Sequence, residues 1–241
     1  MQVENTAAVL ISGMALLLSI VATVISIHRK KRESQRIIRS QLTDVLSRIV
    51  STNLESIKLQ HRKARKNPEY YNAIVGILSQ QSASLLQQAL YLIEQIPGLV
   101  ASIEYGTIAT ANLNAGDIIQ AENYYQKAIQ VASNEYYRSL AIRNYGLFLF
   151  QHHRFEEARD QYRKSISCLK GSDNLIRYTN GTTYKFWAIN ELNFAKAPKR
   201  AEELFESART EFNAIDHEVT RSNFLQLLES DEKQYLSLNG S

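Results

Sequence analysis

The chain contains few residues that break helices or form cross-links. Its 241 residues include nine glycines, three prolines and one cysteine. So few glycines and prolines cannot supply the many tight turns of a β-sandwich or barrel, and the sequence therefore predicts an all-α fold. The single cysteine, Cys168, excludes an intramolecular disulfide and a zinc site built from several cysteines. At this length a hydrophobic core is large enough to be stable without either.

The sequence also lacks the common motifs of catalytic and cofactor sites. No glycine-rich phosphate loop occurs, and the five histidines form neither an H-E-x-x-H motif nor a pair spaced four apart. Ser167 and Lys170 have the spacing of a serine–lysine nucleophile, but the other elements of that site are missing. We therefore expect a protein that is not an enzyme, with no catalytic residue, no metal and no cofactor.

The net charge of +4 is distributed unevenly along the chain. Residues 28–66 hold twelve Lys and Arg residues against three acids, whereas residues 67–241 hold sixteen against twenty. The large C-terminal part is thus mildly acidic and offers no general basic surface for a phosphate backbone. We expect no nucleic-acid partner.

A long uncharged run, residues 7–27, lies near the N-terminus and reads AAVLISGMALLLSIVATVISI. A helix of this length spans about 31 Å, which matches the hydrocarbon core of a bilayer at about 30 Å. The preceding residues 1–6 have no Lys or Arg, and the run is longer than the apolar core of a signal peptide. No polar stripe interrupts it, as a buried core helix would require. The run therefore predicts a single transmembrane helix.

Four basic residues follow the run almost directly: Arg29, Lys30, Lys31 and Arg32. The only charge before the run is Glu4. Because Lys and Arg flanking a span stay on the cytoplasmic side, residues 1–6 are expected outside and everything from residue 28 onward in the cytoplasm. The same four residues are expected to lie at the membrane surface, where anionic headgroups attract them.

Small residues recur within the run at spacings of three and four, at Ser12, Ala15, Ser19, Ala22 and Ser26. These positions share one helix face, and small side chains let two helices approach closely in lipid. They form the candidate face of a homo-oligomer. The alternative is that Ala and Ser are simply common in membrane spans.

Residues 28–66 are predicted to form a basic juxtamembrane stalk. Apolar residues from 36 to 59 follow a spacing of three and four, which indicates an amphipathic helix. This helix either pairs with itself as a short coiled coil or packs on the following domain, and two heptads are too few to decide. A polar break at 61–68 precedes a further helical stretch, 69–95, which is either one helix or two nearly collinear helices.

One pattern of small, aromatic and small residues occurs three times in the C-terminal part. The triplets are Ala121, Tyr125, Ala128; Ala158, Tyr162, Ser165; and Ala201, Phe205, Ala208. Spacings of four and three place each triplet on one helix face, where the small residues admit a neighbouring helix and the aromatic fills the groove. Three occurrences at offsets of 37 and 43 residues predict a stack of helical hairpins.

These units resemble degenerate members of the tetratricopeptide-repeat superfamily, over about residues 102–212. The matching positions are Tyr105, Ile108 and Ala109 before a turn at Gly116-Asp117, and Ile142, Tyr145 and Gly146 before a turn at His152-His153-Arg154. In the third unit Trp187 is expected at the start of the first helix, with a turn through Ala197-Pro198-Lys199. Asn112 departs from the family pattern, which usually has an aromatic there. Residues 216–236 are expected to form a closing helix over the last repeat.

The resemblance implies that residues 67–241 form a helical-repeat domain with a concave surface that binds a protein or peptide partner. The candidate ligand-binding residues lie off the core face of the first helices, at Thr107, Thr110, Asn114, Arg143, Asn144 and Gln151. Our hypothesis is a single-pass, membrane-anchored, non-enzymatic adaptor or scaffold with a cytoplasmic TPR-like domain. One alternative is a self-assembling structural subunit of a membrane-associated complex. A membrane-bound enzyme, the remaining class, would need a pocket lined by polar residues.

The topology is the first testable prediction. A reporter fused after Ser241 should be active only in the cytoplasm, because the basic residues 29–32 keep the C-terminal end of the span on the cytoplasmic side. Replacing these four residues by Gln should increase the fraction of inverted molecules, measured with paired cytoplasmic and extracytoplasmic reporters. A reporter active only on the far side contradicts the orientation.

Overall fold

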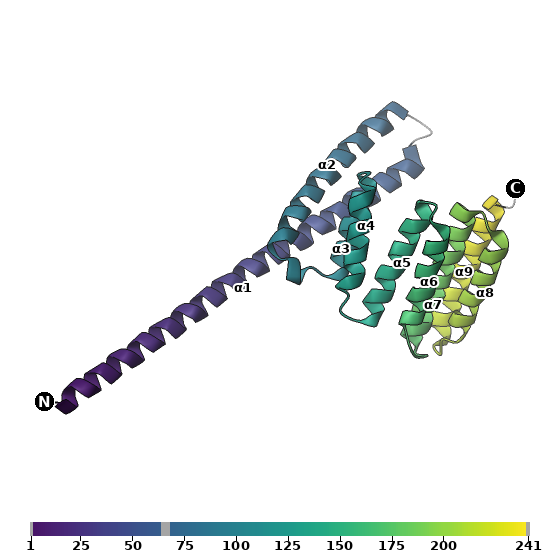
Figure 1. Ribbon diagram of the computed structural model, residues 1–241. Helices are drawn as coiled ribbons and strands as arrows, with labels where there is room; N and C mark the ends of the chain where they lie inside the picture. Colours follow the sequence, from purple (N-terminus) through teal and green to yellow (C-terminus); the bar gives the residue numbers. More distant parts are fainter. Residues whose placement is uncertain (1, 64–67, 240–241) are drawn as a thin grey trace. The chain divides into compact units, whose positions relative to one another are not determined.

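The computed structural model describes the backbone of residues 2–63 and 68–239, and the side chains of residues 21–59, 69–70 and 72–235 (Figure 1). Over these residues the chain is all-α, apart from one short 3-10 turn and one short π-helical segment. It divides into two compact units, residues 1–99 and 100–241. The predicted all-α fold class is confirmed.

The first unit is a hairpin of two long helices. Helix α1 spans Gln2–Lys63, α2 spans Pro68–Gln95, and a 3-10 turn covers Pro97–Leu99. The second half of α1 packs against α2 through buried apolar side chains, at Leu42, Val45, Leu46 and Ile49 on α1 and at Leu85, Leu86, Ala89 and Ile93 on α2. Arg39 Nη1 donates a hydrogen bond of 2.6 Å to the Leu99 carbonyl and ties the turn to α1. Within the described residues, the helix predicted as a stalk therefore packs against α2 of its own chain, and α2 is one continuous helix.

The predicted membrane span, 7–27, falls within α1, but the side chains of residues 7–20 lie outside the described part. Ser12, Ala15 and Ser19 of the candidate oligomer face are therefore outside it as well, whereas Ala22 and Ser26 are described and exposed. The described residues contain no helix that is long and apolar enough to cross a membrane. The basic residues 29–32 are exposed on α1.

The second unit is a row of antiparallel helix pairs. The pairs are α3 (Ser102–Asn114) with α4 (Ile118–Gln130), α5 (Glu135–Gln151) with α6 (Phe155–Cys168), and α7 (Asn174–Asn190) with α8 (Pro198–Asn213). Helix α9 (Glu218–Asn239) packs on α8 and also contacts α7, through Tyr178 with Phe224 and Lys185 with Asp231. Figure 1 shows the helices of this unit side by side. The predicted stack of helical hairpins is confirmed.

All nine positions of the three small–aromatic–small triplets are buried. Close approach of the paired helices also depends on glycine. A Cβ atom built on Gly146 of α5 would lie 2.9 Å from Tyr162 Cε2 of α6, and one on Gly181 of α7 would lie 2.5 Å from Phe212 Cε1 of α8. We call the first helix of each pair the inner helix and the second the outer helix. The aromatic ring of the outer helix thus occupies the space that a side chain on the inner helix would take.

Short polar side chains begin the helices. The side chains of Asp117, Asn134 and Asp173 accept hydrogen bonds from backbone amides three residues on, at 3.0, 2.9 and 2.9 Å. Each satisfies one of the free amides at the start of α4, α5 or α7. Gly116, at φ +84°, makes the predicted turn before Asp117. The second predicted turn, His152 to Arg154, also lies between two helices.

The expected position of Trp187, at the start of a helix, is wrong. Trp187 lies near the end of α7 instead of at its start, and Pro198 begins α8 instead of standing within the turn. Helix α7 starts thirteen residues earlier, after Asp173, in a threonine-rich stretch with weak helix propensity. Thr179 and Thr183 direct their hydroxyls to carbonyls four residues back, at 2.7 and 2.8 Å, so packing overrides the propensity.

Two smaller expectations have mixed outcomes. Asn112, which replaces the usual aromatic, is buried, and its Nδ2 donates to the Ile108 carbonyl at 2.9 Å. The closing helix exists, and Phe224 and Leu228 pack on the core. Val219 and Leu227 of the same helix, however, are 64% and 56% exposed, so these two apolar side chains do not cover the last helix pair.

A buried ion pair joins neighbouring hairpins. The side chain of Glu191 is fully buried and accepts from Arg159 Nε at 2.8 Å, from Arg159 Nη2 at 2.7 Å and from Trp187 Nε1 at 2.9 Å. The hydrogen bond to Glu191 is the main reason that the pKa of Arg159 lies above its usual value. Arg159 comes from α6 and Glu191 follows α7, so the pair fixes one hairpin against the next.

Arg159→Met should destabilise the protein by about 3–5 kcal/mol, because it leaves the buried Glu191 carboxylate without its bidentate partner and with only the more distant Arg200, at 3.9 Å. The double variant Arg159→Met/Glu191→Gln removes the charge, keeps an acceptor for Trp187, and should recover more than half of that loss. Denaturant unfolding followed by circular dichroism measures both. A double variant no more stable than the single one contradicts this role of the pair.

Candidate functional site

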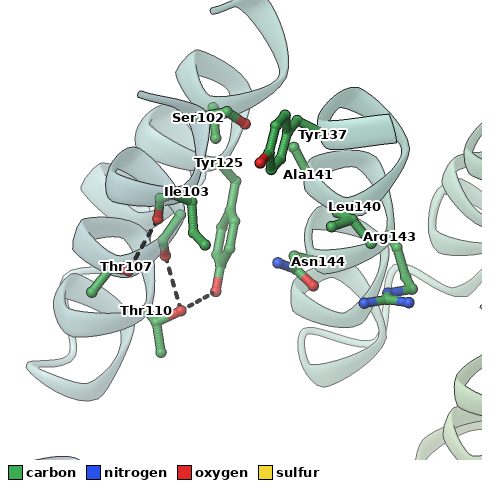
Figure 2. A pocket seen from close by; sticks show the side chains of 12 residues that line it. Ser102, Ile103, Thr107, Thr110, Tyr125, Tyr137, Leu140, Ala141, Arg143 and Asn144 are labelled. Carbon is green, nitrogen blue, oxygen red and sulfur yellow. Dashed lines mark hydrogen bonds between the residues drawn. The ribbon is translucent and has the colours of Figure 1, made fainter. Parts of the chain in front are cut away.

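A groove of about 210 Å³ lies on the second unit between α3 and α5, with α4 at its floor. Its lining comes from Ser102, Ile103, Gly106, Thr107 and Thr110 on α3, Tyr125 and Ala128 on α4, and Tyr137, Leu140, Ala141, Arg143 and Asn144 on α5. Figure 2 shows most of these side chains facing one another across the gap between the two helices. Helix α4 contacts both α3 and α5, and the buried Ala128 on α4 leaves room above it for the groove.

Tyr125 of α4 lies at the floor of the groove, with its hydroxyl at the Thr110 end. Tyr125 is a buried aromatic of the first helix pair, and its Oη lies 3.1 Å from Thr110 Oγ1 (Figure 2). Thr110 donates its own proton to the Gly106 carbonyl at 3.0 Å, so Tyr125 is the donor to Thr110. Burial raises the pKa of Tyr125, and the hydrogen bond to Thr110 opposes this only in part. The phenol is therefore neutral at physiological pH.

The polar groups of α3 are held in fixed orientations. Thr107 Oγ1 donates to the Ile103 carbonyl at 3.0 Å, in the same manner as Thr110. With both protons committed to the backbone, the two threonine oxygens are left as hydrogen-bond acceptors. Across the groove, Asn144 of α5 points toward Tyr125 (Figure 2) and offers an amide that both donates and accepts. This end of the groove suits a peptide group or another mixed donor and acceptor.

The other end of the groove is apolar. Ile103 is 68% exposed, Tyr137 is 42% exposed, and Leu140 lies on the same helix as Tyr137, one turn further along. Large apolar side chains exposed together indicate a surface that another molecule covers. The groove therefore combines an apolar end with a hydroxyl and amide end.

Arg143 leaves α5 on the side away from Asn144, as Figure 2 shows. Its guanidinium carbon lies 5.3 Å from the centre of the Phe186 ring on α7, and Lys185 Nζ lies 5.5 Å from the same ring. Burial lowers the pKa of Arg143, while nearby tyrosines oppose the shift. Arg143 is thus a partly buried cation at the junction of α5 and α7.

Four of the six predicted ligand-binding residues come together in the groove: Thr107, Thr110, Arg143 and Asn144. Asn114 and Gln151 are exposed at the last turns of α3 and α5 and do not line it. Sequence analysis missed Tyr125, which it placed in the core, and the apolar residues Ile103 and Tyr137. A signal was present for Tyr125, since a tyrosine on a core face needs a partner for its hydroxyl.

Other polar clusters of the second unit have structural roles. Glu122 accepts from Tyr145 Oη at 2.5 Å and from Arg154 Nη1 at 2.7 Å, which links the first two hairpins. Burial alone would raise the pKa of Glu122, but these two hydrogen bonds outweigh it and lower the pKa. Ser167 Oγ donates to the Lys164 carbonyl at 3.1 Å, so its proton is committed to the backbone. Within the described residues, no group of three or more His, Cys, Asp or Glu side chains is placed to hold a metal ion.

Comparisons of the chain with protein-family models, with curated proteins and with solved structures gave no match. No family is therefore assigned to the chain. The stacked antiparallel helix pairs and the groove between α3 and α5 are the observations on which a function has to be based.

Proposed function

We propose that the chain is a non-enzymatic, membrane-anchored adaptor that binds a protein partner in the groove between α3 and α5. The groove itself carries this proposal: exposed apolar side chains at one end and oriented hydroxyls and an amide at the other. The stack of helical hairpins supports the finer assignment to a TPR-like repeat domain, whose inner helices offer such a surface.

The size of the groove favours a protein over a small molecule. Pockets for drug-sized ligands enclose about 300–1,000 Å³, and this groove, at about 210 Å³, is smaller and open to solvent. A space of this size accepts one or two side chains of a longer segment. The hydrogen bonds of Thr107 and Thr110 hold the groove ready before binding, which reduces the entropy lost on association.

The apolar run 7–27 and the basic residues 29–32 support a single-pass anchor with its N-terminus outside and the hairpin stack in the cytoplasm. Helix α1 is continuous from Gln2 to Lys63, so no break separates the proposed span from the stalk. The anchor would confine the groove to the neighbourhood of a membrane. Partners that meet it there gain from a raised effective concentration.

A self-assembling structural subunit is the second candidate, and one observation favours it. Tyr70, Ile77 and Tyr91 of α2 are 50%, 64% and 66% exposed and occupy three of four successive positions at heptad spacing, with Ser84 at the fourth. Such a line on a helix that is already paired resembles half of a coiled-coil seam. In that role the anchor and the hairpin of α1 and α2 would chiefly build an oligomer.

A groove variant and a control variant outside the groove test the adaptor function. Ile103→Asp together with Asn144→Ala should reduce capture of the partner at least about tenfold, because it removes an apolar anchor and an amide from the groove. Ile119→Asp is the control, since Ile119 on α4 is 75% exposed and does not line the groove. Full-length variants are purified from membranes after cross-linking, and captured proteins are quantified by mass spectrometry.

Both variants should keep the melting temperature, because exposed substitutions usually change the free energy of unfolding by less than about 0.5 kcal/mol. Equal loss of capture in the groove variant and the Ile119→Asp control contradicts the proposed surface. Unchanged capture with loss of self-association in Ile77→Asp or Tyr91→Asp would place the structural subunit first.

A further inference from the structure

Arg143 differs from the other partly buried arginines of the second unit. Arg154, Arg159, Arg177 and Arg209 each form an ion pair with a carboxylate at 2.7 to 2.9 Å. Arg221 has no carboxylate partner, but its Nη1 donates to the Ile215 carbonyl at 3.1 Å. Among the described residues, no carboxylate lies within 4.0 Å of Arg143, and its neighbours are the aromatic rings of α5, α6 and α7. Arg143 therefore carries a charge that its own unit does not neutralise.

A partly buried guanidinium without an anion is costly, and such groups normally have a partner. The ring of Phe186 compensates only in part, since a cation–π contact is worth about 0.5–2 kcal/mol. The second cation beside this ring, Lys185, is already paired with Asp231 of α9 at 2.8 Å. One unpaired positive charge thus remains where α5 meets α7.

This charge borders the groove. Arg143 is one of its lining residues, and Asn144, the next residue, points into it (Figure 2). A segment that places an apolar side chain near Ile103 and Tyr137 and its backbone near Asn144 would pass Arg143 as it leaves the groove toward α7. The segment would then carry its anion within a few residues of its apolar anchor.

We propose that the partner of this groove is an acidic peptide segment, and that one of its carboxylates pairs with Arg143. This inference rests on the proposed function and names the chemistry of the partner. A carboxylate fits better than a phosphate, because phosphate-recognition sites gather several arginines, whereas Arg143 is a single unpaired charge. The planar guanidinium can hold both carboxylate oxygens at once.

The test selects peptides from a random 12-residue library displayed on phage, with the full-length chain in detergent as bait. Selected sequences should be enriched in Asp and Glu. Their dissociation constants, measured by fluorescence anisotropy, should rise at least about tenfold for Arg143→Gln, the loss expected when a charge-assisted hydrogen bond is removed. Arg138→Gln is the control, because Arg138 is exposed on the same helix and does not line the groove.

A double-mutant cycle separates contact from damage to the fold. Replacing the acidic residue of a selected peptide by Gln should weaken binding to the wild type about as much as Arg143→Gln does, and should cause no further loss in that variant. Additive losses overturn the proposed carboxylate contact. The melting temperature of each variant is recorded alongside.

The remaining outcomes distinguish the acidic-partner inference from the proposed adaptor function on which it rests. Peptides that depend on Ile103 and Asn144, but are neutral or bind Arg143→Gln equally well, overturn the acidic partner and leave the adaptor function standing. If the selected peptides depend on none of these three residues, or if no peptide is selected, the groove is not a peptide site and both proposals fail.

Discussion

Each hairpin of the second unit depends on how closely its two helices approach each other. Gly146 and Gly181 stand where the aromatic rings of Tyr162 and Phe212 press against the inner helix, and a single added methyl group would overlap either ring. On the outer helices, alanine and serine allow the same close approach, because their side chains are small. Ala158 and Ser165 are fully buried on either side of Tyr162. The aromatic rings fill the space, so the core is dense without long apolar side chains at the crossings.

This close packing also builds the candidate site. Because α4 lies tightly against α3, the ring of Tyr125 passes between α3 and α5 and its hydroxyl reaches Thr110. In the next hairpin the hydroxyl of Tyr162 accepts from Asn190 Nδ2 at 2.7 Å instead, and Arg159 pairs with Glu191, so that region is closed by internal bonds. The groove lies where the Tyr125 hydroxyl bonds to Thr110 of its own helix pair, and the exposed amide of Asn144 on α5 faces the gap. Arg143, between these two regions, is a partly buried arginine with no carboxylate within 4.0 Å among the described residues, and aromatic rings surround it.

Spacing within one helix predicted the features that depend on local sequence. The all-α class, the nine buried triplet positions and the turns at Gly116 and His152 follow from periodicity and turn chemistry, and the structure has them. The start of α7 was missed because its threonines have weak helix propensity and are held by packing. Phe186 beside Arg143 could not be predicted, because their contact depends on the register between two hairpins. For the same reason the pairing of α2 with α1 was left open by the two heptads of the stalk.

The same substitution at two helical glycines tests the central role of close helix crossings most directly. Gly181→Ala should lower the free energy of unfolding by about 1–3 kcal/mol through overpacking against Phe212. Gly106→Ala, on α3 with no atom within 4 Å of the added carbon, should raise it by about 0.4–1 kcal/mol, because alanine loses less backbone entropy than glycine. Urea unfolding of the full-length chain, followed by circular dichroism, measures both. The two substitutions are predicted to change the free energy of unfolding in opposite directions. Equal stabilisation by both would contradict the account.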